Sequence, residues 1–315
     1  MYIPLHWHST FSFLEAVSSP GNIVKKAQEL WLPAIAITDY TGLYGLPSFT
    51  QAAKAADIKA ILWVELGFVL DLNATLLGKS IGNIVLLAET QEGYQNLMKL
   101  TSFANQDGIS GKPKIDLKAL QQWSKGIVTI TWGTESWLWV MLNAGEQKER
   151  IFEIYEMIHK ISGENCYLEV VAQSEQEIFH LREINQLCLS FAEKTGTKCL
   201  INNIYSYPNP TDKPTRELAL AIKDNKKIYD SDRRKPVGAY HIMTEEEIRK
   251  IWLDNGYSEE QLNERLTNNE LLAERVSAQI PFSSGLFPKY AAPAEIDQLY
   301  EQHKTELIIE GETSA

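Results

Sequence analysis

The sequence lacks the features of a membrane or secreted protein. No apolar run approaches the roughly 18 residues that a membrane-spanning helix needs. The first residues show no basic region followed by an apolar one, so no secretory signal peptide is visible. We therefore expect a cytoplasmic protein that does not contact membranes.

Cysteine and positive charge are also in short supply. The 315 residues include three cysteines (Cys166, Cys188 and Cys199), an odd number without metal-ligand spacing, and we predict reduced core residues of a cytosolic protein. The formal net charge of −11 argues against the basic surface that proteins gripping duplex DNA by themselves usually carry. One basic stretch, residues 223–227 and 233–235, is interpreted as a solvated loop.

Histidine is scarce too, with six residues, but His6 and His8 stand one residue apart in the opening stretch 2–12. On a strand, such residues point to the same side of the sheet. Neutral imidazole nitrogens bind metal ions, so the pair could hold one ion or two adjacent ones. The competing interpretation is structural, because most H-x-H pairs in strands do not bind metal.

Apolar runs alternate with amphipathic helical patterns through the first two thirds of the chain. Runs of this kind are typical of buried parallel strands, and apolar residues at helical spacing are typical of the helices that cover them. The strand-like segments are residues 2–12, 34–39, 58–70, 83–88, 126–131, 167–171 and 198–202. Right-handed crossovers would close such parallel βαβ units into one α/β barrel, although the length also allows two modest domains.

Polar residues gather at the carboxyl ends of these segments, where the chemistry of an α/β barrel is found. A carboxylate in the middle of an apolar strand, such as Glu65, is expensive to bury unless it is paired or bound to a metal. The residues at or near this end are His6, His8, Asp39, Glu65, Asn202 and Asn203.

The remainder of the chain, from residue 208, has a helical character. Capping signals at Thr244 and Ser258 begin helices, and residues 266–280 form a further helical run. Residues 286–293 are extended and bounded by proline, as a linker would be. A last helix over residues 295–309 has an apolar face that needs a cover.

A series of short motifs runs in order over nearly all of the chain. Its members are residues 6–12, 32–39, 52–61, 85–88, 92–97, 167–169, 203–210 and 287–290. The series resembles the PHP (polymerase and histidinol phosphatase) domain at the N-terminus of the bacterial DNA polymerase III alpha subunit. The resemblance implies a distorted (βα)7 barrel over residues 1–207, a helical extension over 208–285, and a linker over 286–315 that begins the connection to a polymerase palm.

The resemblance also implies a site. In that family, His, Asp and Glu side chains at the barrel mouth hold up to three divalent metals, which activate water and neutralise phosphate charge during phosphoester hydrolysis. In some polymerases this is a proofreading 3′–5′ exonuclease. This chain keeps His6, His8 and Glu65, and Glu15 stands where the family has the Asp of its opening motif, so these four are the candidate ligands of zinc, manganese or magnesium.

Other positions depart from the family pattern. Tyr40 and Asn83 stand where the family has histidines, Ile204 and Ser206 where it has a later Asp and His, and Trp132 where a further ligand is expected. The four remaining histidines fall on helices or in the tail. We therefore expect either no metal or a residual one-metal site. The residues expected around it are Asp39, Tyr40, Asn83 and Asn203.

These losses favour a structural function. We expect a PHP domain, or a split subunit, that scaffolds a polymerase palm and fingers region in cis or as a separate chain, and that contacts other replisome subunits and reaches DNA only through the assembly. Palm carboxylate motifs are absent, so the chain is not expected to polymerise DNA. One alternative is a free-standing PHP phosphoesterase or 3′–5′ exonuclease with a reduced metal site. A weaker alternative is an amidohydrolase-type barrel, which would need a carbamylated lysine or further histidines.

Three tryptophans, Trp31, Trp63 and Trp132, stand where the family usually has glycine. Glycine permits backbone conformations and close approaches that an indole does not. Divergence is the plain explanation. A second hypothesis is that the source reads a stop codon as glycine and the sequence was translated with tryptophan, which ordinary TGG codons at all three positions would exclude.

Overall fold

The computed structural model describes residues 1–73, 82–106, 112–131, 136–282, 296 and 298–303. The chain divides into two compact units, Met1–Ile280 and Pro281–Ala315. In the second unit the described residues 298–303 are helical, within the range predicted for the last helix. The domain boundaries at residues 207 and 285 remain predictions.

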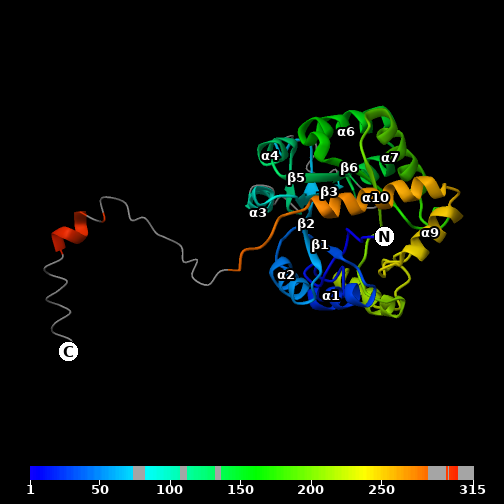
Figure 1. Ribbon diagram of the computed structural model, residues 1–315, viewed down its shortest axis with the longest axis horizontal. Helices are drawn as coiled ribbons and strands as arrows, with labels where there is room; N and C mark the ends of the chain where they lie inside the picture. The colour runs from blue at the N-terminus through cyan, green and yellow to red at the C-terminus, as the bar shows by residue number, and fades with distance from the viewer. Residues whose placement is uncertain (74–81, 107–111, 132–135, 283–295, 297, 304–315) are drawn as a thin grey trace. The chain divides into compact units, whose positions relative to one another are not determined.

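The first unit combines one curled sheet with helices that cover its outer face (Figure 1). Its helices are α1 (Pro20–Glu29), α2 (Leu46–Ala55), α3 (Gln91–Gln106), α4 (Leu117–Gln122), α5 (Trp137–Asn143), α6 (Lys148–Ser162), α7 (Leu181–Thr195), α8 (Lys213–Lys223), α9 (Glu245–Asp254) and α10 (Glu259–Arg275), with 3-10 turns at Gly163–Asn165 and Pro210–Asp212. None of the helices in the described residues is long and apolar enough to cross a bilayer.

The capping signals begin helices where the sequence predicts them. Thr244 and Ser258 each accept a hydrogen bond from the amide three residues on, as N-caps of α9 and α10. The separate helical run expected from residue 266 to residue 280 is wrong, because α10 continues unbroken to Arg275. Its buried side includes polar Arg265 and Asn269, which interrupt the apolar pattern without interrupting the helix.

The sheet has the strand order β1-β2-β3-β5-β6-β7, with β4 paired to β2. The strands are β1 (Ala34–Tyr40), β2 (Lys59–Phe68), β3 (Gly82–Ala88), β4 (Lys114–Ile115), β5 (Ile127–Thr131), β6 (Cys166–Val171) and β7 (Cys199–Asn202). The α/β barrel expectation is confirmed, but the expectation of uniformly parallel strands is wrong at β3, which runs antiparallel to both β2 and β5. Apolar runs look alike in both directions, and no helix appears among the described residues between β2 and β3 to mark a crossover.

The opening stretch, predicted as a strand, closes the barrel without becoming one of its regular strands. Its one β-bridge joins Trp7 to Tyr205, beyond β7. On this side Tyr205 exchanges two backbone hydrogen bonds with the stretch, and on the other side Ala36 and Thr38 of β1 donate to its carbonyls. The two edges of the sheet are thus joined through residues 4–8, which makes the barrel a distorted one.

Strand alternation sorts the side chains into two apolar clusters, one between the sheet and its helices and one inside the barrel. The inner cluster includes Ile61 and Trp63 of β2. The next inward position on β2 is Glu65, so the apolar filling gives way to a polar layer towards the carboxyl end of this strand. At the opposite end, α10 crosses the barrel, and Leu272 of this helix and Val276 at its end belong to the inner cluster (Figure 1).

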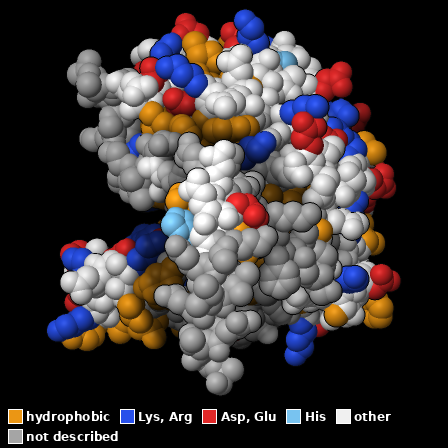
Figure 2. All heavy atoms as spheres, turned by 90° about the vertical axis from the view of Figure 1, so that its left-hand side faces the viewer, with side chains coloured by type: hydrophobic (Ala, Val, Ile, Leu, Met, Phe, Trp, Pro, Cys, Tyr) orange, Lys and Arg blue, Asp and Glu red, His pale blue; other side chains and the backbone are white. Residues whose placement is uncertain are grey.

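The basic stretch is balanced by acidic partners. Arg233 pairs with Glu217, Lys226 with Asp232, and Arg234 with both Asp224 and Glu15. On the face shown in Figure 2, basic and acidic side chains are likewise interspersed. The described surface therefore gives no support to direct binding of duplex DNA through this stretch.

Trp31 occupies a position that suits glycine. Its backbone has φ +55° just beyond α1, where its amide donates to Gln28 and the amide of Leu32 donates to Ala27. This is the helix end in which a left-handed residue is usually glycine. The indole of Trp31 is 87% exposed, whereas Trp63 is fully buried inside the barrel and Trp132 lies outside the described residues. The backbone at residue 31 thus agrees with the codon hypothesis, which the coding DNA decides.

Asn269→Ala is expected to destabilise the protein strongly. Asn269 is fully buried, and its amide donates to Ile3 and Ile201 while its oxygen accepts from the Ile201 amide. Removing it leaves buried backbone groups unpaired and should lower the free energy of unfolding by about 3 kcal/mol. Urea denaturation measures this against Asn263→Ala, an exposed position on the same helix. Equal stability of the two variants would show that this clamp does not hold the barrel together.

Trp31→Gly is expected to stabilise the protein. Glycine removes a left-handed strain of roughly 1–2 kcal/mol, partly offset by the greater entropy that glycine loses on folding, for a net gain of about 0.5–1 kcal/mol. The contrasting variant is Trp63→Gly, which should lose more than about 3 kcal/mol because it empties the barrel interior. Urea midpoints for the two variants test the pair, and a loss of stability in Trp31→Gly would contradict the strain at this position.

Candidate metal centre

The polar layer brings together three potential metal donors. His6 and His8 come from the opening stretch, where their shared orientation is confirmed by ring centroids 5.1 Å apart. Oε2 of Glu65 on β2 lies 3.3 Å from Nε2 of His6 and 3.5 Å from Nε2 of His8. One donor atom from each residue falls within 4.8 Å of the others, and this is the one such group of three found among the described residues.

The donor set fits a single divalent cation. Ligands about 2.0–2.1 Å from a tetrahedral zinc ion stand about 3.3 Å from one another, close to the two separations observed here. Two imidazoles and one carboxylate form a set that zinc accepts in proteins. Nε2 of His8 is buried and makes no hydrogen bond among the described residues, so a cation would satisfy it.

Side-chain amides on both sides hold the buried carboxylates. Asn83 of β3 donates to Oε1 of Glu65 at 2.6 Å, which leaves Oε2 facing the histidines. Across the barrel, Asn202 of β7 donates to Oε2 of Glu169 at 3.1 Å. Asn83 thus lies beside a candidate ligand, as expected, but as a hydrogen-bond donor to it.

Glu169 is a part of the site that the sequence interpretation missed. It lies on β6 and is fully buried, and its Oε1 is 3.8 Å from Nδ1 of His6. The signal was present, because Glu169 is a carboxylate inside an apolar strand, as Glu65 is. The contact with His6 depends on how β6 and the opening stretch meet in the closed barrel, which local sequence does not reveal.

Burial and the two carboxylates shift the pKa values of the two histidines in opposite directions. Burial alone would lower the pKa of His6, but Glu169 and Glu65 outweigh it and raise the pKa to about 9. Burial, together with the neighbouring His6 and Arg216, holds the pKa of His8 well below its usual range. In the metal-free protein at neutral pH, His6 therefore carries a proton between two carboxylates and His8 is neutral.

Asp39 supports the loop after His8 and does not join the donor group. Its carboxylate accepts hydrogen bonds from the backbone amide and hydroxyl of Ser9 and from the hydroxyl of Ser12, each at 2.7 Å. Burial raises the pKa of Asp39, and these hydrogen bonds oppose that shift. Tyr40, the next residue, stacks on the His8 ring at 4.2 Å and covers it.

Glu15 and Asn203 lie apart from the three donors. The Glu15 carboxylate pairs with Lys223 at 2.8 Å and with Arg234 at 3.0 Å. Asn203 accepts a hydrogen bond from Gln173 at 2.8 Å and donates to the Ala239 carbonyl at 2.9 Å, which ties the chain after β7 to the later loop. The structure therefore brings together three of the four predicted ligands.

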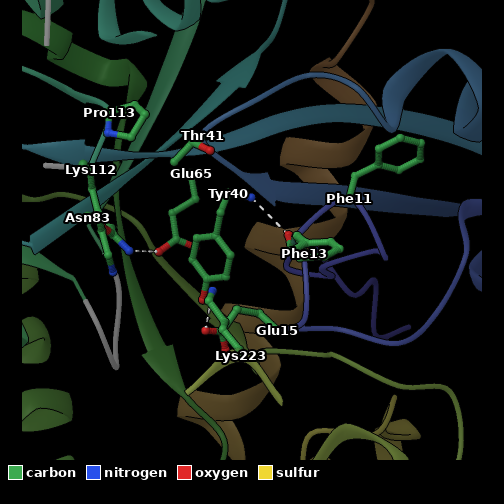
Figure 3. A pocket seen from close by; sticks show the side chains of 12 residues that line it. Phe11, Phe13, Glu15, Tyr40, Thr41, Glu65, Asn83, Lys112, Pro113 and Lys223 are labelled. Atoms are coloured by element: carbon green, nitrogen blue, oxygen red, sulfur yellow. Dashed lines mark hydrogen bonds and ion pairs between the residues drawn. The ribbon is translucent and has the colours of Figure 1, made fainter. Parts of the chain in front are cut away.

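A cavity of about 290 Å³ adjoins the donor group, and it is lined by Glu65, Asn83, Tyr40 and Glu15 together with Lys112 and Lys223. Figure 3 shows Asn83 and Glu65 facing each other, with the Tyr40 ring between this pair and the Glu15–Lys223 pair. Glu15 thus belongs to the mouth of the cavity.

The departures from the family pattern add no further donor among the described residues. Ile204 belongs to the inner apolar cluster, and Ser206 is buried with its amide bonded to the Tyr240 carbonyl. The expected position after β5, Trp132, lies outside the described residues.

Comparison with known proteins places the site in context. DNA polymerase III subunit alpha of Borreliella burgdorferi is 28% identical over 96% of this chain and 26% of its own length. The same subunit of Treponema pallidum is 25% identical over 93% of this chain and 25% of its own length. The chain thus spans about a quarter of the length of these curated relatives.

Among solved structures, a protein of Bifidobacterium adolescentis described as a candidate metal-dependent phosphoesterase is 11% identical, with a TM-score of 0.47, over 82% of this chain and 98% of its own. The family match is more direct, because the PHP domain matches residues 4–173, more than half of the 315. The resemblance inferred from the motifs is confirmed, and the chain belongs to the PHP domain family.

Proposed function

We propose that this chain is the PHP-domain part of a replicative DNA polymerase of the DNA polymerase III alpha type, and that it serves as a cytoplasmic scaffold stabilised by one divalent cation. His6, His8 and Glu65 would hold the cation. An ion bound there would accept donor atoms from both segments, and this coordination would link the opening stretch to β2. Zinc suits the two imidazoles and one carboxylate, because imidazole nitrogen and carboxylate oxygen are both among its usual protein ligands.

One observation carries this proposal: the donors are covered. The side chains of His6 and Glu65 are 0% exposed and that of His8 is 1% exposed. Tyr40 stacks on one ring, and Trp63 lies 6.5 Å from the other. Three protein donors leave one coordination position of a tetrahedral ion free, and the burial of all three donors restricts access of a substrate to that position.

The polymerase context rests on the relatives. They are DNA polymerase III alpha subunits, and the chain corresponds to about a quarter of each. A palm and fingers region, in the same chain or another, is the first partner that we infer, and other replisome subunits follow. The acidic net charge of −11 suits contact with DNA only through that assembly.

A second candidate function is metal-dependent phosphoester hydrolysis, including a 3′–5′ exonuclease. The cavity beside Glu65 favours it, because Lys112 and Lys223 line that cavity and would attract a phosphate. Against it, Lys223 is already paired with Glu15, and Tyr40 covers His8.

His8→Ala is expected to abolish stoichiometric metal binding. The purified protein should hold about one equivalent of zinc or manganese, and the variant should lose it, since two donors seldom retain a structural ion. Metal analysis measures the loss of the ion, and thermal unfolding measures the accompanying loss of stability. His159→Ala on α6 is the matched control. Metal-dependent phosphodiester hydrolysis present in the protein and lost in His8→Ala would favour the second candidate function and overturn the scaffold.

Association with a polymerase region is the second expected outcome. Expressed together with the palm and fingers region of the same genome, the chain should co-purify with it as a stable complex. Asn269→Ala, which loosens the barrel, should weaken that complex in proportion to its loss of folded protein. The polymerase assignment would be contradicted if the gene encodes no palm and fingers region after this chain and the folded chain also binds no such region encoded elsewhere.

A further inference from the structure

Glu169 has a contact that neither packing nor the donor group explains. The residue is fully buried on β6, and Asn202 donates to one carboxylate oxygen, Oε2. The other oxygen, Oε1, accepts no hydrogen bond from the described residues. The ion-pair contact of Oε1 is with His6, 3.8 Å away at Nδ1.

A direct bond from Glu169 to the cation is not what the geometry offers. The group of donors whose ligand atoms lie within 4.8 Å of one another consists of His6, His8 and Glu65, without Glu169. Glu169 faces Nδ1 of His6, whereas Glu65 faces Nε2 at 3.3 Å. The two carboxylates therefore face different nitrogens of the same imidazole ring, Glu65 at Nε2 and Glu169 at Nδ1.

A histidine in this setting has a defined chemical use. An imidazole that binds a metal through one nitrogen commonly donates its other N–H to a carboxylate, which fixes the tautomer and the ring orientation and strengthens the ligand. Such a contact tightens when the ring becomes a ligand, because the N–H becomes a better donor.

We propose that Glu169 is a positioning residue of the metal centre, acting through Nδ1 of His6 so that Nε2 faces a divalent cation. The inference rests on the metal site proposed above. It adds that the site depends on a carboxylate that does not touch the ion.

Charge supports the same assignment. With His6 and His8 neutral, the buried layer holds two carboxylate charges, on Glu65 and Glu169, each on a side chain that is 0% exposed. Buried charges persist when they are balanced, and a divalent cation balances two carboxylates where a monovalent cation does not. Without Glu169 the layer would hold a surplus positive charge once the metal bound.

The test is calorimetric titration of the metal-free protein with zinc and with manganese. Glu169→Gln keeps the volume and an acceptor for Asn202 but removes the charge, and it should bind either metal about 10–100-fold more weakly. The matched control is Glu175→Gln, because Glu175 is also a buried carboxylate, 3% exposed, and is bonded to Asn185 and Tyr257 away from the donors. This control should bind metal as the unaltered protein does.

A second measurement does not depend on how well the variant folds. Nitrogen-15 spectra of the histidine side chains in the zinc-loaded, unaltered protein should show the metal on Nε2 of His6 and a proton on Nδ1. Zinc on Nδ1, or equal affinity of Glu169→Gln and the control, would overturn the role of Glu169 alone. Absence of metal binding by the unaltered protein would overturn the proposed site and this inference together.

Discussion

Two carboxylates buried inside the barrel, Glu65 and Glu169, are the constraint on which the rest of the structure depends. Neither reaches water, and each has a side-chain amide on one of its oxygens, from Asn83 and from Asn202. An amide does not neutralise a charge, so a buried carboxylate that stays ionised needs positive charge in the same layer. His6 can supply this charge, because its Nε2 faces Glu65 and its Nδ1 faces Glu169.

This requirement explains why the opening stretch lies where it does. His6 is delivered by a segment that runs between β1 and the chain beyond β7, where it joins both edges through backbone hydrogen bonds. Asn202 connects the two functions, since its oxygen accepts from the Leu5 amide and its nitrogen donates to Glu169. The same segment therefore closes the barrel and brings the balancing charge of His6 to the buried carboxylates. At neutral pH a proton on His6 can meet the requirement, and a divalent cation meets it more fully because two carboxylates are present.

Much of this fold was predictable from sequence because it depends on local periodicity. The helices, the capping residues Thr244 and Ser258, and most strands follow from residue spacing and hydrogen-bonding groups that act within one turn. The direction of β3 did not follow, because an apolar strand has no intrinsic preference for parallel or antiparallel neighbours. The two-residue strand β4 is too short to produce a pattern at all.

The site was predictable to a similar degree. His6, His8 and Glu65 were found from spacing and from the cost of a buried charge, and they do lie together. Glu15 illustrates the limit, because Lys223 and Arg234, more than two hundred residues along the chain, hold its carboxylate at the cavity mouth. Glu169 illustrates the opposite case, in which the local signal exists but its meaning comes from a nitrogen supplied by a distant segment.

The burial of the three donors bears on the function proposed for the site. A site that must admit a phosphoester needs coordination positions open to the substrate, whereas Tyr40 stacks on the His8 ring and Asn83 donates to Glu65. A site that must only balance buried charge and join the first residues to the sheet needs His6, His8, Glu65 and a partner such as Glu169. Those are the groups that converge here. A site that lacks further ligands but keeps this inner charge balance is the arrangement expected under the proposed scaffold, in which the site contributes to the stability of the barrel.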